Sequence, residues 1–497
     1  MKRNWFVVLA LVVSLALVGG VAASGVQALP GSGWWTSFQV QNVGTGQASV
    51  QVTAYHEQGG ATDTHSASVT LAVNEAQTFI PGGSGWPGVF DVTPGLEAGF
   101  AGSTVLSSDQ PIVAIAQVGN NQVSPPGGTL GVSGGNASAQ YRGVGNPDTT
   151  ISYPLVKHNW ASKTTTFYVQ AAGGAASVTA TYKMNDGSTK TDGPHAIDAN
   201  KSYVFDPAAA SVASSGCGSD ANTSPCVGSV SFASTSGSLA GTVIEHQHTA
   251  SPATLAQSTN TFASSDQDKT LNCPTFKNDW VGRTTGLTVQ NAGGTAATVS
   301  IEIKTAAGTG APATYNATSP SVAAGASYTF YPGLGNVGGM PASSYGAVKV
   351  TSLNNIVAIV NEAGGSPTKA TTYSCFANSS ATTKIALPQV KEGFAGSTTG
   401  VTIQNVGAST TNVDATYSCG GTNYTHATVN IGAGSGKTFW RHSASGANWT
   451  GTPLPDNKNC SVVVTSDSQN VVAIAQEAAY PSGSLDTKNY EGFNLTP

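Results

Sequence analysis

Charged residues are scarce in this chain. They make up 9% of its 497 residues, whereas about 25% is usual in soluble proteins. The formal net charge is only −5 and the sequence has no basic patch, so a nucleic-acid-binding role has no support. Glu, Lys, Arg and Leu are sparse, and no segment after residue 28 has a 3.6-residue apolar period. These shortages exclude a helical fold and favour a β-protein.

A repeated word organises the chain. Three segments begin with proline and end with glutamine sixteen residues later: P-L-V-K-H-N-W-A-S-K-T-T-T-F-Y-V-Q from Pro154, P-T-F-K-N-D-W-V-G-R-T-T-G-L-T-V-Q from Pro274 and P-Q-V-K-E-G-F-A-G-S-T-T-G-V-T-I-Q from Pro388. A shortened copy runs from Pro30 to Gln41 and lacks the P-x-x-K part. Successive prolines lie 114 to 124 residues apart, and a unit above about 100 residues can bury its own core.

The N-terminus predicts export. Lys2 and Arg3 precede an almost wholly apolar run, and Val26-Gln27-Ala28 offers small residues for cleavage. The alternative is an uncleaved membrane anchor, because the apolar run reaches about 19 residues when its glycines are counted. The predicted organisation is therefore a signal peptide at 1–28 and four domains at the following ranges: 29–146, 147–265, 266–380 and 381–497.

Six cysteines occur, all in the later domains. An even number behind a signal sequence indicates disulfides rather than a metal site, since no CxxC or Cys/His cluster is present. Six cysteines allow 15 pairings. Domain membership favours three of them: Cys217 with Cys226, Cys273 with Cys375, and Cys419 with Cys460.

Each domain contains about seven short stretches with alternating apolar residues. Phe38 and Val40 share one face, with Gln39 and Gln41 opposite, and an N-V-G-T-G turn leads to the next such stretch. This number and length of strands predict an all-β fold of four tandem immunoglobulin-like β-sandwiches. The junctions are short, so we expect the domains to touch and to form a rod.

The string Y-P-L-V-K-H-N-W, with G-F-A-G-S-T-V-L-S-S-D-Q-P-I-V-A-I-A in the first domain, resembles a repeat of secreted and cell-surface proteins of Chloroflexota and related bacteria. The resemblance covers nearly all of the chain after the signal peptide. It implies an exported, immunoglobulin-like, surface-associated protein and no particular activity.

Motifs of known chemistry are weak in this sequence. G-A-G-S-G-K-T at 432–438 lacks the first glycine of a phosphate loop and precedes a strand rather than a helix. Glu245-His246-Gln247-His248 places two histidines on one strand face, but aligned positions hold Glu362 and Glu477. A pair of catalytic carboxylates has no fixed spacing and stays open. No catalytic residue, metal ligand or cofactor is predicted.

Tryptophans are the candidates for ligand contact. Trp160, Trp280 and Phe394 recur at one position of the repeat, which favours a plug in each domain core over a sugar platform. Four other tryptophans do not recur and are predicted as possible contacts for a ligand or partner: Trp34, Trp35, Trp86 and Trp449.

Two functions remain from the sequence. The first is a non-enzymatic structural or adhesive protein of the bacterial cell surface or extracellular matrix, which associates with itself or with cell-envelope components through exposed strand edges. The alternative is a secreted array of carbohydrate-binding modules, in which repetition raises the avidity for a glycan. Both are extracellular, and neither has a membrane span after signal cleavage.

Overall fold

The computed structural model describes residues 8–11, 29, 34–62, 64–79, 100–120, 137–248, 255–306, 312–365, 369–394, 396–440, 454–479 and 487–495. These residues form antiparallel sheets and no α-helix, so the all-β prediction is confirmed. Three single 3-10 turns interrupt the strands: η1 (Ser264–Asp266), η2 (Pro332–Leu334) and η3 (Asn378–Ser380). Within the described parts of the chain, no helix is long and apolar enough to span a membrane.

The strands fall into four consecutive groups, which we call units 1 to 4. Unit 1 comprises β1 (Val8–Leu11), β2 (Trp35–Asn42), β3 (Ala48–His56), β4 (Thr64–Leu71), β5 (Ala76–Phe79), β6 (Gly102–Ser108), β7 (Ile112–Gly119) and β8 (Ser138–Arg142). Unit 2 comprises β9 (Thr150–Lys157), β10 (Lys163–Ala172), β11 (Ala176–Met184), β12 (Thr189–Ile197), β13 (Ser202–Phe205), β14 (Val227–Ser234), β15 (Ser238–Gln247) and β16 (Ala256–Asn260).

The other two units repeat this succession. Unit 3 comprises β17 (Asp268–Asn278), β18 (Arg283–Asn291), β19 (Val299–Thr305), β20 (Thr314–Thr318), β21 (Ser327–Phe330), β22 (Ser344–Gly364), β23 (Lys369–Ser374) and β24 (Phe376–Ala377). Unit 4 comprises β25 (Lys384–Glu392), β26 (Ser397–Asn405), β27 (Thr411–Cys419), β28 (Thr422–Ile431), β29 (Gly436–Trp440), β30 (Lys458–Ser466), β31 (Val471–Ala479), β32 (Lys488–Glu491) and β33 (Phe493–Asn494).

Unit 2 shows the common sheet topology. One sheet has the order β12-β11-β14-β9 and the other has the order β13-β10-β15-β16. Units 1 and 4 repeat both orders, and in unit 3 the long strand β22 takes part in both, which joins them into one eight-stranded sheet. The first strand of each unit pairs with its sixth strand, whereas the first strand of an immunoglobulin domain pairs with the second.

In unit 1, the first-strand position beside β6 is taken by β1. This strand comes from the predicted signal peptide, and Val8 pairs with Ser107 while Leu11 pairs with Thr104. Units 2 to 4 fill the same position with the strand that carries the P-x-x-K word. The word of unit 1 is shortened and lacks the P-x-x-K part that supplies this strand in units 2 to 4.

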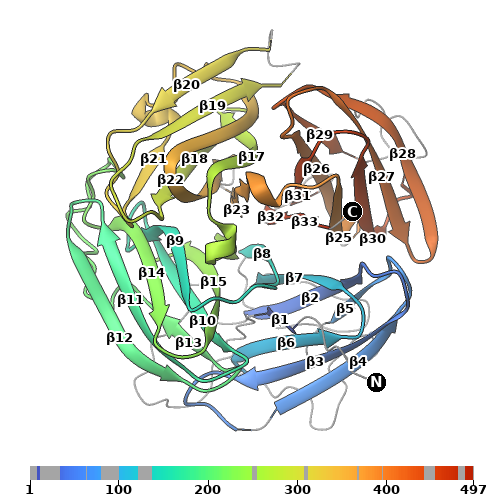
Figure 1. Ribbon diagram of the computed structural model, residues 1–497, viewed down its shortest axis with the longest axis horizontal. Helices are drawn as coiled ribbons and strands as arrows, with labels where there is room; N and C mark the ends of the chain where they lie inside the picture. Colours follow the sequence, from blue (N-terminus) through green and yellow to red (C-terminus); the bar gives the residue numbers. More distant parts are fainter. Residues whose placement is uncertain are drawn as a thin grey trace.

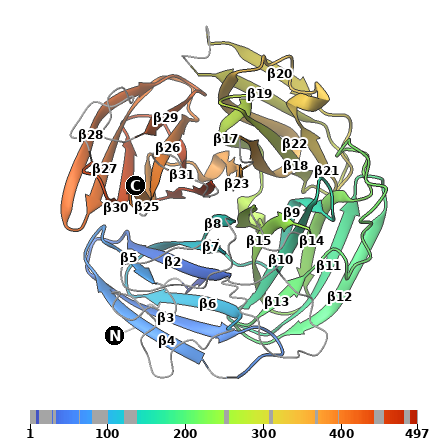
Figure 2. The same ribbon diagram turned by 180° about the vertical axis from the view of Figure 1, so that it is seen from behind.

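The four units are arranged in a closed ring, and the prediction of a rod is wrong. Figures 1 and 2 show units 1 and 4 side by side, with β8 and β23 near the centre and β4, β12, β20 and β28 at the rim. The strands β16 and β32 each contact both β8 and β23. Closure is direct, because the Gln39 amide of unit 1 donates to the carbonyl oxygen of Pro388 in unit 4 at 2.7 Å. The Gln389 side chain of unit 4 donates in turn to Gln39 at 2.8 Å.

The ring forms because the seventh strand of a unit has two buried apolar faces. In β22, Ile356, Ala358 and Val360 pack into the core of unit 3, whereas Val357 and Ile359 pack into the core of unit 2. In β31, the alternate residues Val472 and Ile474 likewise pack into unit 3. Ile115 of β7 packs into unit 4, which brings the two ends of the chain together. Units 3, 4 and 1 thus complete the cores of units 2, 3 and 4, respectively.

Candidate functional site

The repeated lysine forms a buried ion pair with a repeated glutamate. Lys157 of the P-x-x-K word lies 2.9 Å from Glu245 on β15, and Lys163 lies 3.3 Å from the same carboxylate. Unit 3 contains the equivalent triad Lys277–Glu362–Arg283. Unit 4 contains Lys391–Glu477–Lys488, in which the second cation comes from β32, because Ser397 stands at the position of Lys163. All of these side chains are largely buried. In each of the three units, one carboxylate pairs with two cations near the centre of the ring.

Each triad also receives an amide from the next unit. Asn361 of unit 3 donates to Glu245 at 3.2 Å, Gln476 of unit 4 donates to Glu362 at 3.3 Å, and Gln140 of unit 1 donates to Glu477 at 3.4 Å. Burial alone would raise the pKa of each glutamate, but the paired cations outweigh burial and lower it, for Glu477 to about 2. The three carboxylates are therefore ionised at neutral pH and link neighbouring units.

The boundary between units 1 and 2 has no such triad. Val118 of unit 1 lies at the glutamate position, and Trp34 lies at the position of Lys163. These residues form an apolar cluster with Tyr168 and Ile244 of unit 2. The cation and the carboxylate are thus replaced together in unit 1, at the two aligned positions.

Two of the four predicted ligand-contact tryptophans, Trp34 and Trp35, lie in the described part of the chain, and both are buried. Trp34 is fully buried in the apolar cluster, and Trp35 is buried in the core of unit 1. Both side chains hold structure and are not accessible to a ligand in the ring. Trp86 and Trp449 lie outside the described residues.

A hollow of about 420 Å³ lies between units 2 and 3, which we call the inner hollow. Trp160, Tyr331 and Leu334 line its sides, while the buried side chains of Lys157 and Glu362 reach it from the centre of the ring. The Lys157 ammonium lies 5.4 Å from the centre of the Trp160 ring, a cation–π distance. Aromatic walls with a few fixed polar groups are typical of a small-molecule site.

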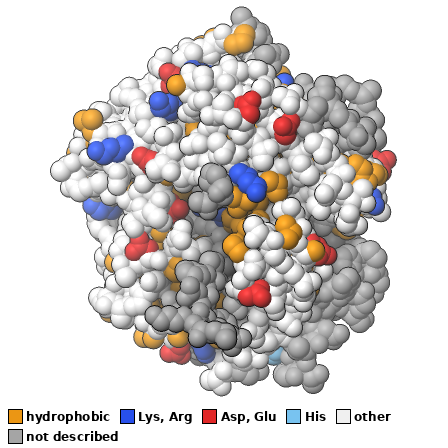
Figure 3. Space-filling view, turned by 45° about the vertical axis from the view of Figure 1, so that its right-hand side comes forward, with side chains coloured by type: hydrophobic (Ala, Val, Ile, Leu, Met, Phe, Trp, Pro, Cys, Tyr) orange, Lys and Arg blue, Asp and Glu red, His pale blue; other side chains and the backbone are white. Residues whose placement is uncertain are grey.

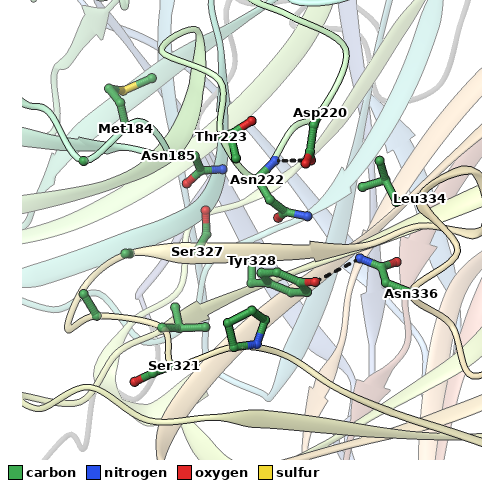
Figure 4. Close-up of a pocket in the computed structure, with 15 residues that line it drawn as sticks. Met184, Asn185, Asp220, Asn222, Thr223, Ser321, Ser327, Tyr328, Leu334 and Asn336 are labelled. Carbon is green, nitrogen blue, oxygen red and sulfur yellow. Dashed lines mark hydrogen bonds between the residues drawn. The ribbon is translucent and has the colours of Figure 1, made fainter.

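A second hollow, the outer hollow, lies between the same two units and has a volume of about 500 Å³ (Figure 4). Its lining mixes uncharged polar residues with apolar ones, and the ring of Tyr328 lies across it. The Tyr328 hydroxyl accepts a hydrogen bond from the Asn336 amide at 3.2 Å, and Asp220 accepts one from the backbone N–H of Asn222 at 2.8 Å. These hydrogen bonds fix the side chains and the loop before any ligand arrives.

Asn222 separates the two hollows. Its amide donates to the carbonyl oxygen of Thr329 at 3.0 Å and accepts from the N–H of the same residue at 2.7 Å, which holds unit 2 to unit 3. Thr329 lines the inner hollow and Tyr328 lines the outer one, because successive residues of a strand point to opposite sides. The pair of hollows therefore belongs to one unit boundary with a fixed geometry.

The recurring aromatic position is half-buried, and at Trp160 the side chain packs against the core of unit 2, as expected for a residue that closes the core. Trp160, Trp280 and Phe394 are only half-buried, and each lies in the turn that precedes the second strand of its unit. Trp280 packs on Tyr345 with ring centres 4.7 Å apart. Trp160 alone of these three lines the inner hollow. The aromatic residue recurs because the turn that carries it recurs. The cavity beside Trp160 depends on the neighbouring unit, which supplies the opposite wall.

The histidine and glycine motifs have structural roles. His246 contacts the Thr166 hydroxyl through Nε2 and the Gln247 carbonyl oxygen through Nδ1, which occupies both of its ring nitrogens. Within the described ranges, no three His, Cys, Asp or Glu side chains are placed to hold a metal. Gly434 has φ +67° in the turn that connects β28 to β29, and Lys437 and Thr438 belong to β29, as expected for a hairpin rather than a phosphate loop.

The structure joins all six cysteines in the predicted pairs, Cys217–Cys226, Cys273–Cys375 and Cys419–Cys460. Cys273 and Cys375 lie at the first strand and beside the last strand of unit 3, which pair with each other. Charged side chains are scattered singly over the face shown in Figure 3, and hydrophobic side chains gather near its middle. The scarcity of charge in the sequence thus appears as a surface of hydroxyl, amide and backbone groups.

Comparisons with known proteins leave the family open. The chain matches no protein-family model and no curated protein. A solved structure of Thermotoga maritima 1070 is 16% identical with a TM-score of 0.19, covering 23% of this chain and 96% of that one. A glycoside hydrolase of family 32 from Bifidobacterium adolescentis is 7% identical with a TM-score of 0.14, covering 89% of this chain and 98% of that one. Similarities this low carry no argument about fold or function.

Proposed function

We propose that this protein is a non-enzymatic, adhesive protein of the bacterial cell surface that binds glycans at the boundary between units 2 and 3. The observation that carries the proposal is the inner hollow, where Trp160 and Tyr331 stand beside buried polar groups that are already hydrogen-bonded. Aromatic rings supply apolar contact area for the faces of sugars, and fixed polar groups supply orientation. These features support carbohydrate binding, the alternative function predicted from the sequence, at the inner hollow.

A binding role fits the electrostatics of this boundary better than catalysis. A glycosidase needs one carboxylic acid with a raised pKa as its proton donor. Glu362 is the carboxylate that lines the inner hollow, and the pKa of this group is lowered, because Lys277 and Arg283 outweigh the effect of burial. Its ion pairs at 2.7 and 2.9 Å hold it in the ionised form and commit it to the structure.

Export and a surface location complete the proposal. Disulfides persist in oxidising compartments, and three are present here. The resemblance to surface repeats of Chloroflexota-type bacteria points to the same location. We further propose that each unit is one sandwich domain of the immunoglobulin-like kind, with its first strand moved beside the sixth.

Binding to a panel of soluble glycans tests the proposal. Trp160→Ala should weaken binding at least tenfold, because it removes an aromatic wall of the inner hollow. Trp280→Ala is the matched control, since Trp280 occupies the same position of the repeat but does not line the hollow. The proposal fails if no glycan binds, or if the two variants weaken binding equally.

Self-assembly is a second candidate, favoured by the rim of the ring. The strands β4, β12, β20 and β28 each end a sheet and lie at the outer edge, where their free backbone groups can pair with another copy (Figure 1). Electron microscopy of the purified protein tests this candidate. Sheets or fibres of laterally joined rings would support it, and single rings at all concentrations would exclude it.

A further inference from the structure

We infer that the inner hollow selects an anionic sugar, one that carries a carboxylate, over a neutral sugar of the same shape. This inference rests on the proposed glycan-binding function and specifies its ligand. The carrying observation is an excess of positive charge around the hollow. Two ammonium groups line the hollow, those of Lys157 and Lys163, against the single carboxylate of Glu362. That carboxylate is already paired with Lys277 and Arg283, which lie outside the lining.

Glu245 cannot neutralise the two lysines further. Its Oε1 accepts from Lys157, Lys163 and the Gln257 amide, and its Oε2 accepts from Asn361. A carboxylate offers about four acceptor positions, so this one is fully used. An additional anion is therefore the group that the remaining charge would attract.

The two lysines that hold Glu245 are also the ones that line the inner hollow. Lys157 is 6% exposed and Lys163 is half-buried, and Glu245 itself does not line the hollow. An ammonium group has three N–H donors, and the acceptor described above for each lysine is Glu245. The other N–H groups of both lysines are available to a ligand in the hollow. Such bonds are strong because both partners are charged and the site is partly shielded from water.

Trp160 places the sugar beside these donors. Its indole lies next to the Lys157 ammonium, and its buried Nε1–H meets no acceptor among the described residues. A sugar ring against the Trp160 and Tyr331 walls would bring one substituent to the lysines and a hydroxyl to the indole N–H. A uronate residue meets both requirements, since its carboxylate projects from the ring that packs against the aromatic walls.

The test compares an oligogalacturonate with its methyl ester, which has the same shape but no charge. With the wild-type protein, calorimetry should show at least tenfold tighter binding of the acid, and this preference should fall as salt is added. Lys163→Met should abolish the preference while the ester still binds. Lys163 is the better variant, because Glu245 retains Lys157, Gln257 and Asn361 when it is removed. Lys190→Met on β12 removes the same charge outside the hollow and should change nothing.

The outcomes separate the inference from the proposed function. Equal binding of acid and ester, with both lost in Trp160→Ala, overturns the anionic preference and leaves glycan binding in place. A preference for the acid that survives Lys163→Met also overturns the inference, because the charge would then be recognised elsewhere. Failure of both oligosaccharides and of every glycan in the panel overturns the proposed function as well.

Discussion

At the scale of single residues, the ion triads place the lysine of the repeated sequence word at the contacts between neighbouring units of the ring. Breaking a buried ion pair by removing one partner costs about 3–5 kcal/mol, because the other charge is left uncompensated. An exposed pair contributes about 0–1 kcal/mol. Within a triad, the carboxylate and its cations therefore matter to stability chiefly because removing one leaves the others buried without a partner. The amide donated by the next unit makes the contact between the two units depend on the same carboxylate.

Glu362→Gln tests this requirement. It leaves Lys277 and Arg283 without their carboxylate at a fully buried site, so we expect the free energy of unfolding to fall by about 3–5 kcal/mol. Urea denaturation measures it. The control is Glu302→Gln, which breaks the partly exposed pair with Lys304 and should cost less than about 1 kcal/mol. Equal losses in the two variants would show that the buried triad has no special role.

The pH dependence of stability isolates the triad of unit 4. Folding lowers the pKa of Glu477 from 4.5 to about 2, so the unfolded chain binds the proton more tightly. The stabilisation is complete above about pH 5, and it is lost as the pH falls from 4.5 toward 2, a loss of about 3 kcal/mol. We expect the stability difference between wild type and Glu477→Gln to shrink by this amount between about pH 6 and pH 2. A constant difference would contradict the lowered pKa.

These residues were within reach of the sequence. The lysine of the P-x-x-K word and the aligned glutamates occur together in three units, and both are missing from the first. The joint absence of the lysine and the glutamate from one unit indicates that the two residues pair with each other. The hollow between units 2 and 3 had no such signal, because its walls come from turns 171 residues apart, at Trp160 and Tyr331.

At the scale of elements, the seventh strand explains why the arrangement of the units was missed. The words I-V-A-I-A-Q and I-V-A-I-V-N are continuous apolar runs, which indicate a strand buried on both faces. An independent sandwich would bury one face only. Strands that alternate apolar and polar residues can be predicted from sequence, because every sandwich has this two-residue period. What the second apolar face of the seventh strand packs against depends on a neighbouring unit that is distant in sequence.

The first strand of unit 1 gives a prediction at this scale. A chain that starts at Leu29 lacks β1, so β6 becomes an edge strand with unpaired backbone groups. We expect hydrogen exchange in residues 102–108 to be faster in this chain than in the full-length protein. Residues 227–234 of β14 are the matched control, because β9 covers them in both chains. Unchanged exchange in 102–108 would mean that another segment fills the position.

At the scale of the whole molecule, the ring couples the four units. A unit taken alone would expose the outward face of its seventh strand and would lose the side chains that its neighbour inserts into its core. Full burial of one such side chain is worth about 1.5–3 kcal/mol. The segment 266–380 taken alone would lose Val472 and Ile474 from its core and would expose Val357 and Ile359.

Ring closure itself can be tested at Ile115. This side chain is 2% exposed and packs into unit 4, whereas its neighbours Ala114 and Ala116 pack into unit 1. Ile115→Asp should therefore separate units 1 and 4 without emptying the core of unit 1, because a charge cannot be buried there unpaired. Small-angle scattering should give a radius of gyration of about 23 Å for the compact wild type, and a clearly larger value for the variant.

The control and the contrary outcome fix the meaning of that change. Leu353→Asp alters a side chain that is 84% exposed and should leave the radius of gyration unchanged. Circular dichroism should show that Ile115→Asp keeps its β-structure, since three of the four unit boundaries are untouched. If the variant stays as compact as the wild type, closure does not depend on the apolar contact. In that case the polar contacts between units 1 and 4, such as those of Gln39 with Pro388 and of Gln140 with Glu477, would hold the two units together.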